Sequence, residues 1–182
     1  MRRRRFQDSA LLAGLLAAVL AGPVAAQEHL FRAALFTGLG GAFDAEPSDD
    51  LDHSSYQLGF SWTIEPDVLV GVRYGELGWD ADEALGPRLG SDLQYLTAAG
   101  EYLFNEGYYR SGLYFGLGWY QLEEDAVAEI SSDSAIGLVL GLTGDFRLTD
   151  RFSILVELSG HYTDLEDADI LGMGHAGIAF HF

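Results

Sequence analysis

The sequence contains no cysteine and no lysine, and its 182 residues include only four prolines. The absence of cysteine excludes disulfide bonds, thiolate metal sites and cysteine catalysis. All ten basic residues are arginines, and they are outnumbered by 28 aspartates and glutamates, so the formal net charge is −18. A surface this acidic argues against nucleic acid as a partner and against electrostatic docking to anionic lipid.

Long apolar runs are also scarce, and the only one lies near the N-terminus. Arg2–Arg5 precede the apolar residues Ala10–Ala21, and "PVAA" supplies small residues just before Gln27. This order is typical of a secretory signal peptide, so we expect residues 1–26 to be removed and residues 27–182 to form one domain. No later segment approaches the roughly 20 apolar residues of a transmembrane helix. If the mature chain crosses a membrane, it must do so as a closed β-barrel.

Glycine and aromatic residues are abundant, and they occur in regularly spaced segments with little helical periodicity. Aromatic and β-branched residues favour strands, and repeated glycines weaken helices. The pattern therefore predicts eight strands, an even number, at residues 29–43, 54–64, 68–79, 91–104, 109–121, 134–148, 152–163 and 169–182.

The connections between these segments alternate in kind. Three are tight turns, "IEPDV", "FNEGYY" and "LTDRF". The other four, at 44–54, 80–90, 122–134 and 164–170, are mostly longer and hold 17 of the 27 acidic residues that follow residue 26. Bacterial outer-membrane barrels have short periplasmic turns and longer external loops. With both termini periplasmic, all four acidic connections would lie outside the cell.

Within the segments, apolar and small or polar residues alternate. In "YQLGFSWTI", Tyr56, Phe60 and Trp62 share one face with other apolar residues, and Gln57 and Ser61 share the opposite face. An apolar outer face with small and polar residues inside is the barrel pattern, and aromatic residues gather near both strand ends. The predicted fold class is all-β, an eight-stranded antiparallel up-and-down transmembrane β-barrel.

The chain ends in "GHAGIAFHF", where a polar residue, a glycine and two alternating aromatics occupy His175, Gly177, Phe180 and Phe182. This ending resembles the assembly signal of the small outer-membrane β-barrel family that includes the OmpA and OmpX transmembrane domains. The resemblance implies a place in the outer membrane of a Gram-negative bacterium, among outer-membrane lipid and lipopolysaccharide. It also implies periplasmic chaperones and the barrel-assembly machinery as partners. We expect a monomer.

An eight-stranded barrel is only wide enough for its own side chains to fill. The alternation directs several charged residues inward, and a buried charge needs a partner. We predict that these side chains close the lumen as a network, with a direct pair between Glu101 and Arg110 across a tight turn. The network comprises Arg32, Arg73, Glu101, Arg110, Asp145, Arg147, Glu157 and His161. The alternative is a narrow channel whose conductance would change on replacement of Arg110 or Glu101.

The densest acidic stretch is "DLEDAD". Carboxylate oxygens suit Ca²⁺ and Mg²⁺, but the stretch lacks the spacing and the central glycine of a calcium loop. A solvated acidic loop is the favoured interpretation, and divalent cations that bridge it to lipopolysaccharide phosphates are the alternative. The residues concerned are Asp164, Glu166, Asp167 and Asp169.

Some eight-stranded outer-membrane barrels modify lipid A, and the stretch "HYTD" resembles the His-x-Ser motif of the lipid A 3-O-deacylases. His161 matches the base, but Thr163 stands where the serine should be, and the last strand offers no acid. The deacylases display these residues toward lipid, whereas the alternation places His161 inside. No cofactor motif is present. We therefore expect a non-enzymatic barrel with a structural or surface-interaction role, and a lipid A acyl-modifying enzyme is the alternative.

Overall fold

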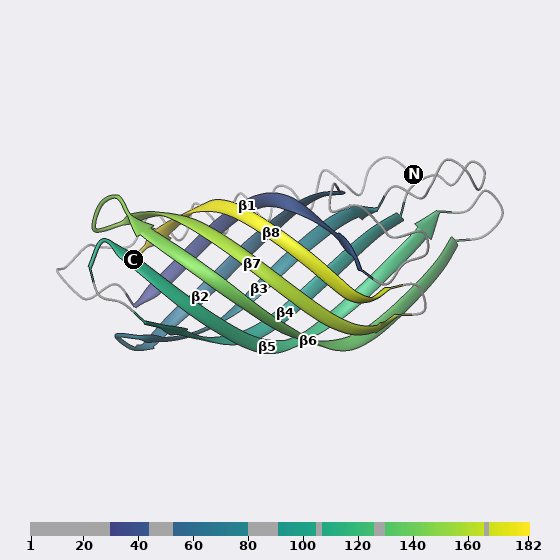
Figure 1. Ribbon diagram of the computed structural model, residues 1–182, viewed down its shortest axis with the longest axis horizontal. Helices are drawn as coiled ribbons and strands as arrows, with labels where there is room; N and C mark the ends of the chain where they lie inside the picture. The colour runs from purple at the N-terminus through teal and green to yellow at the C-terminus, as the bar shows by residue number, and fades with distance from the viewer. Residues whose placement is uncertain (1–29, 44–52, 80–90, 105–106, 126–129, 166–167) are drawn as a thin grey trace.

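The computed structural model describes residues 30–43, 53–79, 91–104, 107–125, 130–165 and 168–182. These residues form one closed barrel in which each strand pairs antiparallel with its neighbours in sequence and β8 pairs with β1. Figure 1 shows the strands crossing the barrel at a steep tilt. The predicted eight-stranded up-and-down β-barrel is confirmed. Among the described residues, no helix is long and apolar enough to cross a membrane.

The strand bounds agree with the sequence prediction to within two residues, except between β5 and β6. The hairpin of these two strands continues in register to the pair Asp125 and Ile130. Most of the segment 122–134, predicted as a loop, is therefore strand. The strands are β1 (Phe31–Ala42), β2 (His53–Glu65), β3 (Val68–Trp79), β4 (Ser91–Leu103), β5 (Tyr109–Asp125), β6 (Ile130–Arg147), β7 (Phe152–Leu165) and β8 (Ala168–His181).

The two ends of the barrel differ. One end carries the short connections β2–β3, β4–β5 and β6–β7 together with residue 30 and Phe182, and we call it the turn end. The opposite end, which we call the loop end, carries the remaining connections. In Figure 1 the turn end is on the left. The connections 44–52 and 80–90, and the predicted signal peptide 1–26, lie outside the described residues.

The outer wall is predominantly apolar, and its polar residues, such as Glu76 and Asp164, lie mainly toward the loop end. In β7 every second side chain is exposed and the others are buried, which is the alternation that a strand imposes when one face looks inward. The exposed set includes long runs of leucine, such as Leu138, Leu140 and Leu142 in β6. Such a surface is unusual for a protein in water and matches the apolar band of a membrane barrel.

Aromatic residues close the seam between the first and last strands at the turn end. The backbones of Phe31 and Phe182 exchange hydrogen bonds of 2.9 and 3.0 Å. Their rings lie 5.7 Å apart, and Phe60, Phe180 and Phe152 extend the contact over β2, β8 and β7. Stacked and tilted ring pairs stabilise beyond the area that they bury. This cluster therefore reinforces the one pairing that joins residues far apart in the sequence.

The interior has two halves of different character. Toward the turn end the lumen is mainly polar, as the alternation predicted, with a small apolar cluster of Ala34, Phe36, Leu155 and Ala179 beside the charged side chains. Toward the loop end it is apolar, with side chains from every strand except β2, so the expectation of small and polar residues throughout the interior is wrong there. This loop-end cluster comprises Ala42, Leu77, Leu93, Tyr95, Tyr120, Leu122, Ala135, Leu165, Leu171 and Met173. Side chains sealed from water and distant from any charge are stabilised best by close apolar packing.

Candidate functional site

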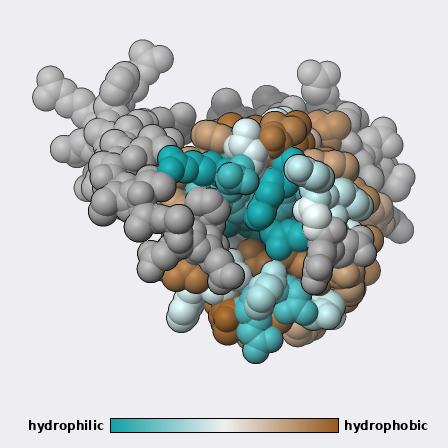
Figure 2. Space-filling model, turned by 90° about the vertical axis from the view of Figure 1, so that its left-hand side faces the viewer, coloured by the Kyte–Doolittle hydropathy of each residue, from teal (hydrophilic) through white to brown (hydrophobic). Residues whose placement is uncertain are grey.

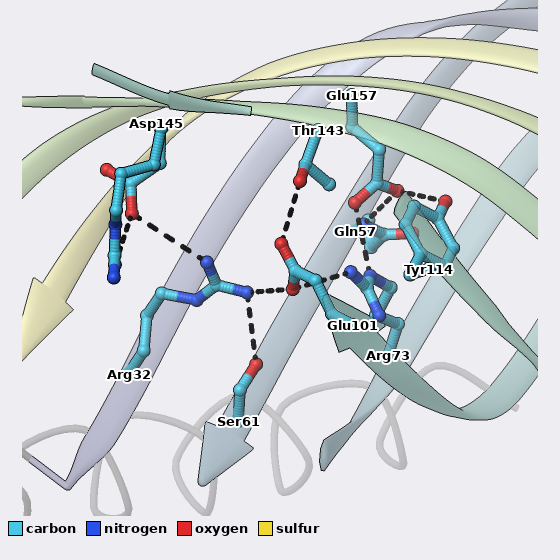
Figure 3. A network of polar contacts seen from close by, with 10 residues as sticks. Arg32, Gln57, Ser61, Arg73, Glu101, Tyr114, Thr143, Asp145 and Glu157 are labelled. Carbon is cyan, nitrogen blue, oxygen red and sulfur yellow. Dashed lines mark hydrogen bonds and ion pairs between the residues drawn. The ribbon is translucent and has the colours of Figure 1, made fainter. Parts of the chain in front are cut away.

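The polar half of the lumen contains a continuous network of charged side chains, shown in Figure 3. Arg32 on β1 donates to the Glu101 carboxylate on β4 at 2.5 Å and to the Ser61 hydroxyl on β2 at 3.3 Å. The second Glu101 oxygen accepts a hydrogen bond of 2.7 Å from Thr143 on β6. Both charged side chains are at most 5% exposed. The contacts join four strands across the barrel through one carboxylate.

Arg73 on β3 connects this group to a second carboxylate. It lies 3.6 Å from Glu101 and donates to Glu157 on β7 at 3.1 Å. Glu157 also accepts hydrogen bonds from Tyr114 at 2.8 Å and from the Gln57 amide at 3.1 Å. The Arg73 guanidinium stacks 4.0 Å from the centre of the Tyr114 ring, a cation–π contact. Glu157 is thus the most heavily coordinated carboxylate in the lumen.

Near the turn end, Asp145 is shared by two arginines. Arg110 donates to one of its oxygens at 3.3 Å, and Arg32 lies 3.9 Å from the same oxygen. The predicted pair between Glu101 and Arg110 is wrong, because Glu101 is directed to Arg32 and Arg73 instead. Arg110 and Asp145 are directly opposite each other in the β5–β6 register, which brings these two side chains together. Cross-strand neighbours meet more readily than residues that flank a turn.

Two further residues of the predicted network lie at its edges. Arg147 points into the turn end, and its Nε atom is buried without a hydrogen bond in the described part of the chain. His161 lies on the loop-end side, where Nδ1 contacts the Tyr120 hydroxyl at 2.8 Å and Nε2 contacts Ser159 at 3.0 Å. Neither residue forms an ion pair with another described residue. Within the described part of the chain, the direct ionic contacts of the lumen therefore join Arg32, Arg73, Glu101, Arg110, Asp145 and Glu157.

The neutral members of the network were not predicted from the sequence. Gln57, Tyr114 and Thr143 all lie on the inward parity of their strands, which is the one signal that could have identified them. Three lumen tyrosines pack closely against glycines, Tyr95 and Tyr114 against a glycine of an adjacent strand and Tyr120 against Gly118 of its own strand. A Cβ atom at Gly75 or Gly141 would lie 2.3 Å from Tyr95 or Tyr114, respectively, and one at Gly118 would lie 2.6 Å from Tyr120. Each glycine lets a ring lie against the wall and aim its hydroxyl at the network.

Replacement of Gly141 by alanine should destabilise the barrel by about 1–3 kcal/mol, the usual cost of overpacking. The added Cβ would displace the Tyr114 ring and with it the hydrogen bond to Glu157. Urea unfolding in detergent or lipid, followed by tryptophan fluorescence, measures this cost. Gly100→Ala is the matched control, because a Cβ there faces outward and meets nothing within 4 Å. An equal loss for both variants would contradict the role assigned to the Tyr114–Gly141 contact.

The residues that resemble the deacylase motif do not face the outer wall. His161 is 3% exposed and Thr163 is 0% exposed, and both point into the barrel. The residues between and beside them on the outward parity are Tyr162 and Asp164. The geometry on which the deacylase alternative depends, a base and a hydroxyl displayed toward lipid beside an acid, is not formed by these two residues.

The acidic stretch and the C-terminal motif lie in different places. Asp164 and Asp169 are exposed at the loop end, and Glu166 and Asp167 are outside the described residues. Within the described chain, no group of three or more His, Asp or Glu side chains is placed to hold a metal ion. Of the motif, His175 points inward and contacts the Ser55 hydroxyl at 3.0 Å. Phe180 and Phe182 belong to the outer aromatic cluster described above, and Gly177 lies between them and His175 on β8.

Comparison with solved structures identifies barrels of the same size. The chain superposes on Neisserial surface protein A with a TM-score of 0.71 and 16% identity, covering 84% of this chain and 97% of that one. The N-terminal β-barrel domain of Pseudomonas aeruginosa OprF matches with a TM-score of 0.62 and 18% identity, covering 86% and 100%. The outer membrane enzyme PagL matches with a TM-score of 0.52 and 13% identity, covering 81% and 97%. Searches with family models and against curated sequences find no match.

These similarities establish the fold. The chain has the architecture of the small eight-stranded outer-membrane β-barrels, as the resemblance to the OmpA and OmpX domains implied. Because the same architecture serves surface proteins and an enzyme, it does not select a function. That choice depends on the side chains of the wall and the lumen.

Proposed function

We propose that this protein is a monomeric outer-membrane β-barrel with a structural or surface-interaction role and a lumen that does not conduct. The observation that carries the proposal is the combination of a predominantly apolar outer wall with a lumen filled over both halves. The charged network occupies the turn-end half, and the loop-end cluster occupies the other. An eight-stranded barrel leaves no room for a channel once these side chains are in place.

The proposed orientation places the turn end in the periplasm and the loop end outside the cell. Its support is the asymmetry of the connections, because outer-membrane barrels keep their short turns in the periplasm. The acidic connections then project outward, where they are the surface available for partners. In this orientation Phe180 and Phe182 lie at the periplasmic rim, where the assembly machinery and periplasmic chaperones would meet them.

The absence of cysteine makes the orientation directly testable in a Gram-negative host. Ser134→Cys places a thiol on an exposed position of β6 near the loop end, and Asp150→Cys places one on the exposed β6–β7 turn. On intact cells, a membrane-impermeant maleimide should label the Ser134→Cys protein and not the Asp150→Cys protein. After lysis it should label both. Labelling of Asp150→Cys alone on intact cells, or recovery of the protein in the soluble fraction, would refute the proposal.

The lipid A acyl-modifying alternative receives less support. A nucleophile requires a base that a third group orients, with access to the substrate. His161 is instead held by Tyr120 and Ser159 inside the barrel, beneath the loop-end cluster. The narrow-channel alternative would require the apolar cluster to open, and its leucines are packed to 0% exposure at Leu77, Leu93 and Leu171. We therefore favour the non-enzymatic, closed barrel.

A further inference from the structure

Among the described residues, the polar half of the lumen lies next to the turn end and is separated from the loop end by the loop-end cluster. The loop-end cluster excludes water from the opposite half, because its largest members are completely buried. Figure 2 views the turn end, where hydrophilic side chains gather in the centre of a hydrophobic ring. A polar molecule would therefore reach the charged network most directly through this end. We call this region the turn-end mouth; Arg32, Asp145 and His181 are 1–4% exposed there, and Arg110 and Arg147 are half-buried.

The charges of the polar half do not balance. Among the described residues, four arginines point into it, and they are matched by three carboxylates, Glu101, Asp145 and Glu157. Glu157 and Glu101 are occupied by Arg73 and Arg32, well inside the barrel. Asp145 is the only carboxylate shared at the mouth. The excess positive charge therefore lies there, and a poorly solvated charge is costly without a partner.

Unpartnered nitrogen atoms mark the same place. The Nη1 atom of Arg32 and the Nε atom of Arg147 are buried and make no hydrogen bond within the described chain. Arg32 is 4% exposed, and its Nη1 is 3.9 Å from Asp145, beyond hydrogen-bond range. The acids of the nearby turns, Glu65, Asp67 and Asp150, form no ion pair with an arginine among the described residues. The Oδ1 atom of Asp145 is likewise buried without a hydrogen bond within the described chain, so the two unpartnered donors exceed the unpartnered acceptors there by one.

We propose that the turn-end mouth binds a small oxyanion of the phosphate type, held chiefly by Arg147 with Arg110 and the free Nη1 of Arg32. A planar guanidinium offers paired N–H donors that match two oxygens of such an anion. The Asp145 carboxylate repels the anion. The three positive charges of Arg32, Arg110 and Arg147 exceed this one negative charge, so the net electrostatic interaction with the anion is attractive. Binding at the mouth itself does not depend on the membrane. That the anion comes from the periplasm rests on the proposed function and its orientation.

The purified protein in an uncharged maltoside detergent provides the test, with inorganic phosphate as the probe and sodium chloride at equal ionic strength as the reference. Because the sequence has only ten arginines, four of them in residues 1–26, the NMR signals of the arginine Nε–H groups can be resolved individually. Phosphate should shift the signals of Arg147, Arg110 and Arg32 in a saturable manner. Shifts that chloride reproduces at the same ionic strength would overturn the proposal.

Arginine variants then distinguish specific phosphate binding by the residues of the mouth from nonspecific electrostatic attraction to any arginine. Arg147→Gln should weaken phosphate binding at least about tenfold, since it removes a charge-assisted donor. The matched control is Arg151→Gln, four residues away on the turn, which should change the affinity by less than about threefold. Arg147→Lys keeps the charge but lacks the paired donors of a guanidinium, so it should weaken phosphate binding by less than Arg147→Gln but by more than Arg151→Gln. If Arg147→Gln fails to fold, Arg147→Lys provides the test, and an affinity equal to that of the unaltered protein would overturn the role of the guanidinium. Equal losses for Arg151→Gln and Arg147→Gln would overturn the site.

A separate comparison distinguishes a soluble phosphate from the phosphate of a lipid headgroup as the bound anion. Micelles containing phosphatidylglycerol present a lipid phosphate at the rim without free phosphate. If they reproduce the shifts of Arg147 and Arg32, the ligand is a headgroup and the assignment to a soluble anion is wrong. If they leave these signals unchanged, the soluble oxyanion is supported. The cysteine-labelling experiment decides the orientation separately, so failure of one proposal is distinguishable from failure of the other.

Discussion

Replacement of Glu157 by leucine should destabilise the barrel by about 3–5 kcal/mol, the cost of breaking a buried ion pair from one side. The change leaves the Arg73 guanidinium, the Gln57 amide and the Tyr114 hydroxyl without their common acceptor. Arg73 retains only its longer contact of 3.6 Å to Glu101. The free energy of unfolding, measured by urea titration in lipid vesicles, should fall accordingly.

Two further variants show whether the loss comes from the unpaired charge. Glu65→Leu, at an exposed position of the β2–β3 turn, should change stability by no more than about 0.5 kcal/mol. In the double variant Glu157→Leu with Arg73→Leu, the unpartnered charge is removed as well. The double variant should therefore lose less than the sum of the two single variants, because the pair is coupled. Strictly additive losses would indicate that Glu157 and Arg73 do not stabilise each other.

The alternation of residues was sufficient to predict the fold and the direction of most side chains. A strand places successive residues on opposite faces, so one correct strand assignment fixes the facing of the whole segment. For this reason the inward orientation of Arg32, Glu157 and His161 followed from sequence alone. The closing pair of β1 and β8 followed from the even number of strands, since a barrel must close to satisfy its edges.

The partners within the lumen could not be predicted in the same way. Glu101 and Arg110 are near in sequence, but the barrel places Arg32 and Arg73 closer to the Glu101 carboxylate. Those contacts join residues 69 and 28 positions apart, and they depend on how the strands are staggered around the barrel. The apolar loop-end cluster was not predicted either, because the alternation of residues does not give the height of a side chain in the barrel. Its leucines share the inward parity with polar residues, and only their height in the barrel distinguishes them.

The extension of β5 and β6 has a different cause. The stretch 122–134 is acidic and rich in serine, which is typical of a loop. The register established lower in the hairpin nevertheless continues without a bulge to Asp125 and Ile130. The low strand propensity of these residues therefore does not prevent strand formation where a long hairpin already aligns the two backbones. The wall of the barrel is taller on this side than the composition suggested.

The outer wall gives the second prediction of large effect. Leu142 is 56% exposed on β6, and its outward-facing partners on the adjacent strands are Leu113 and Leu158. Its position lies halfway between Phe146 toward the turn end and Leu138, which pairs with Tyr162 toward the loop end. In vesicles, Leu142→Arg should lower the free energy of unfolding by about 2–4 kcal/mol, the cost of an arginine at the bilayer midplane.

The depth of the residue, and not its exposure, should decide this cost. Leu148 is 62% exposed, but it lies beyond the aromatic residues of the turn end, so Leu148→Arg should cost only about 0–1 kcal/mol. On a protein surrounded by water, an arginine at either exposed position would be solvated and nearly neutral in effect. Similar small losses for the two variants would therefore contradict a membrane-embedded wall. A loss of stability confined to Leu142→Arg would place the hydrocarbon core of the membrane at the height of Leu113, Leu142 and Leu158. This is also the height of the charged network in the lumen.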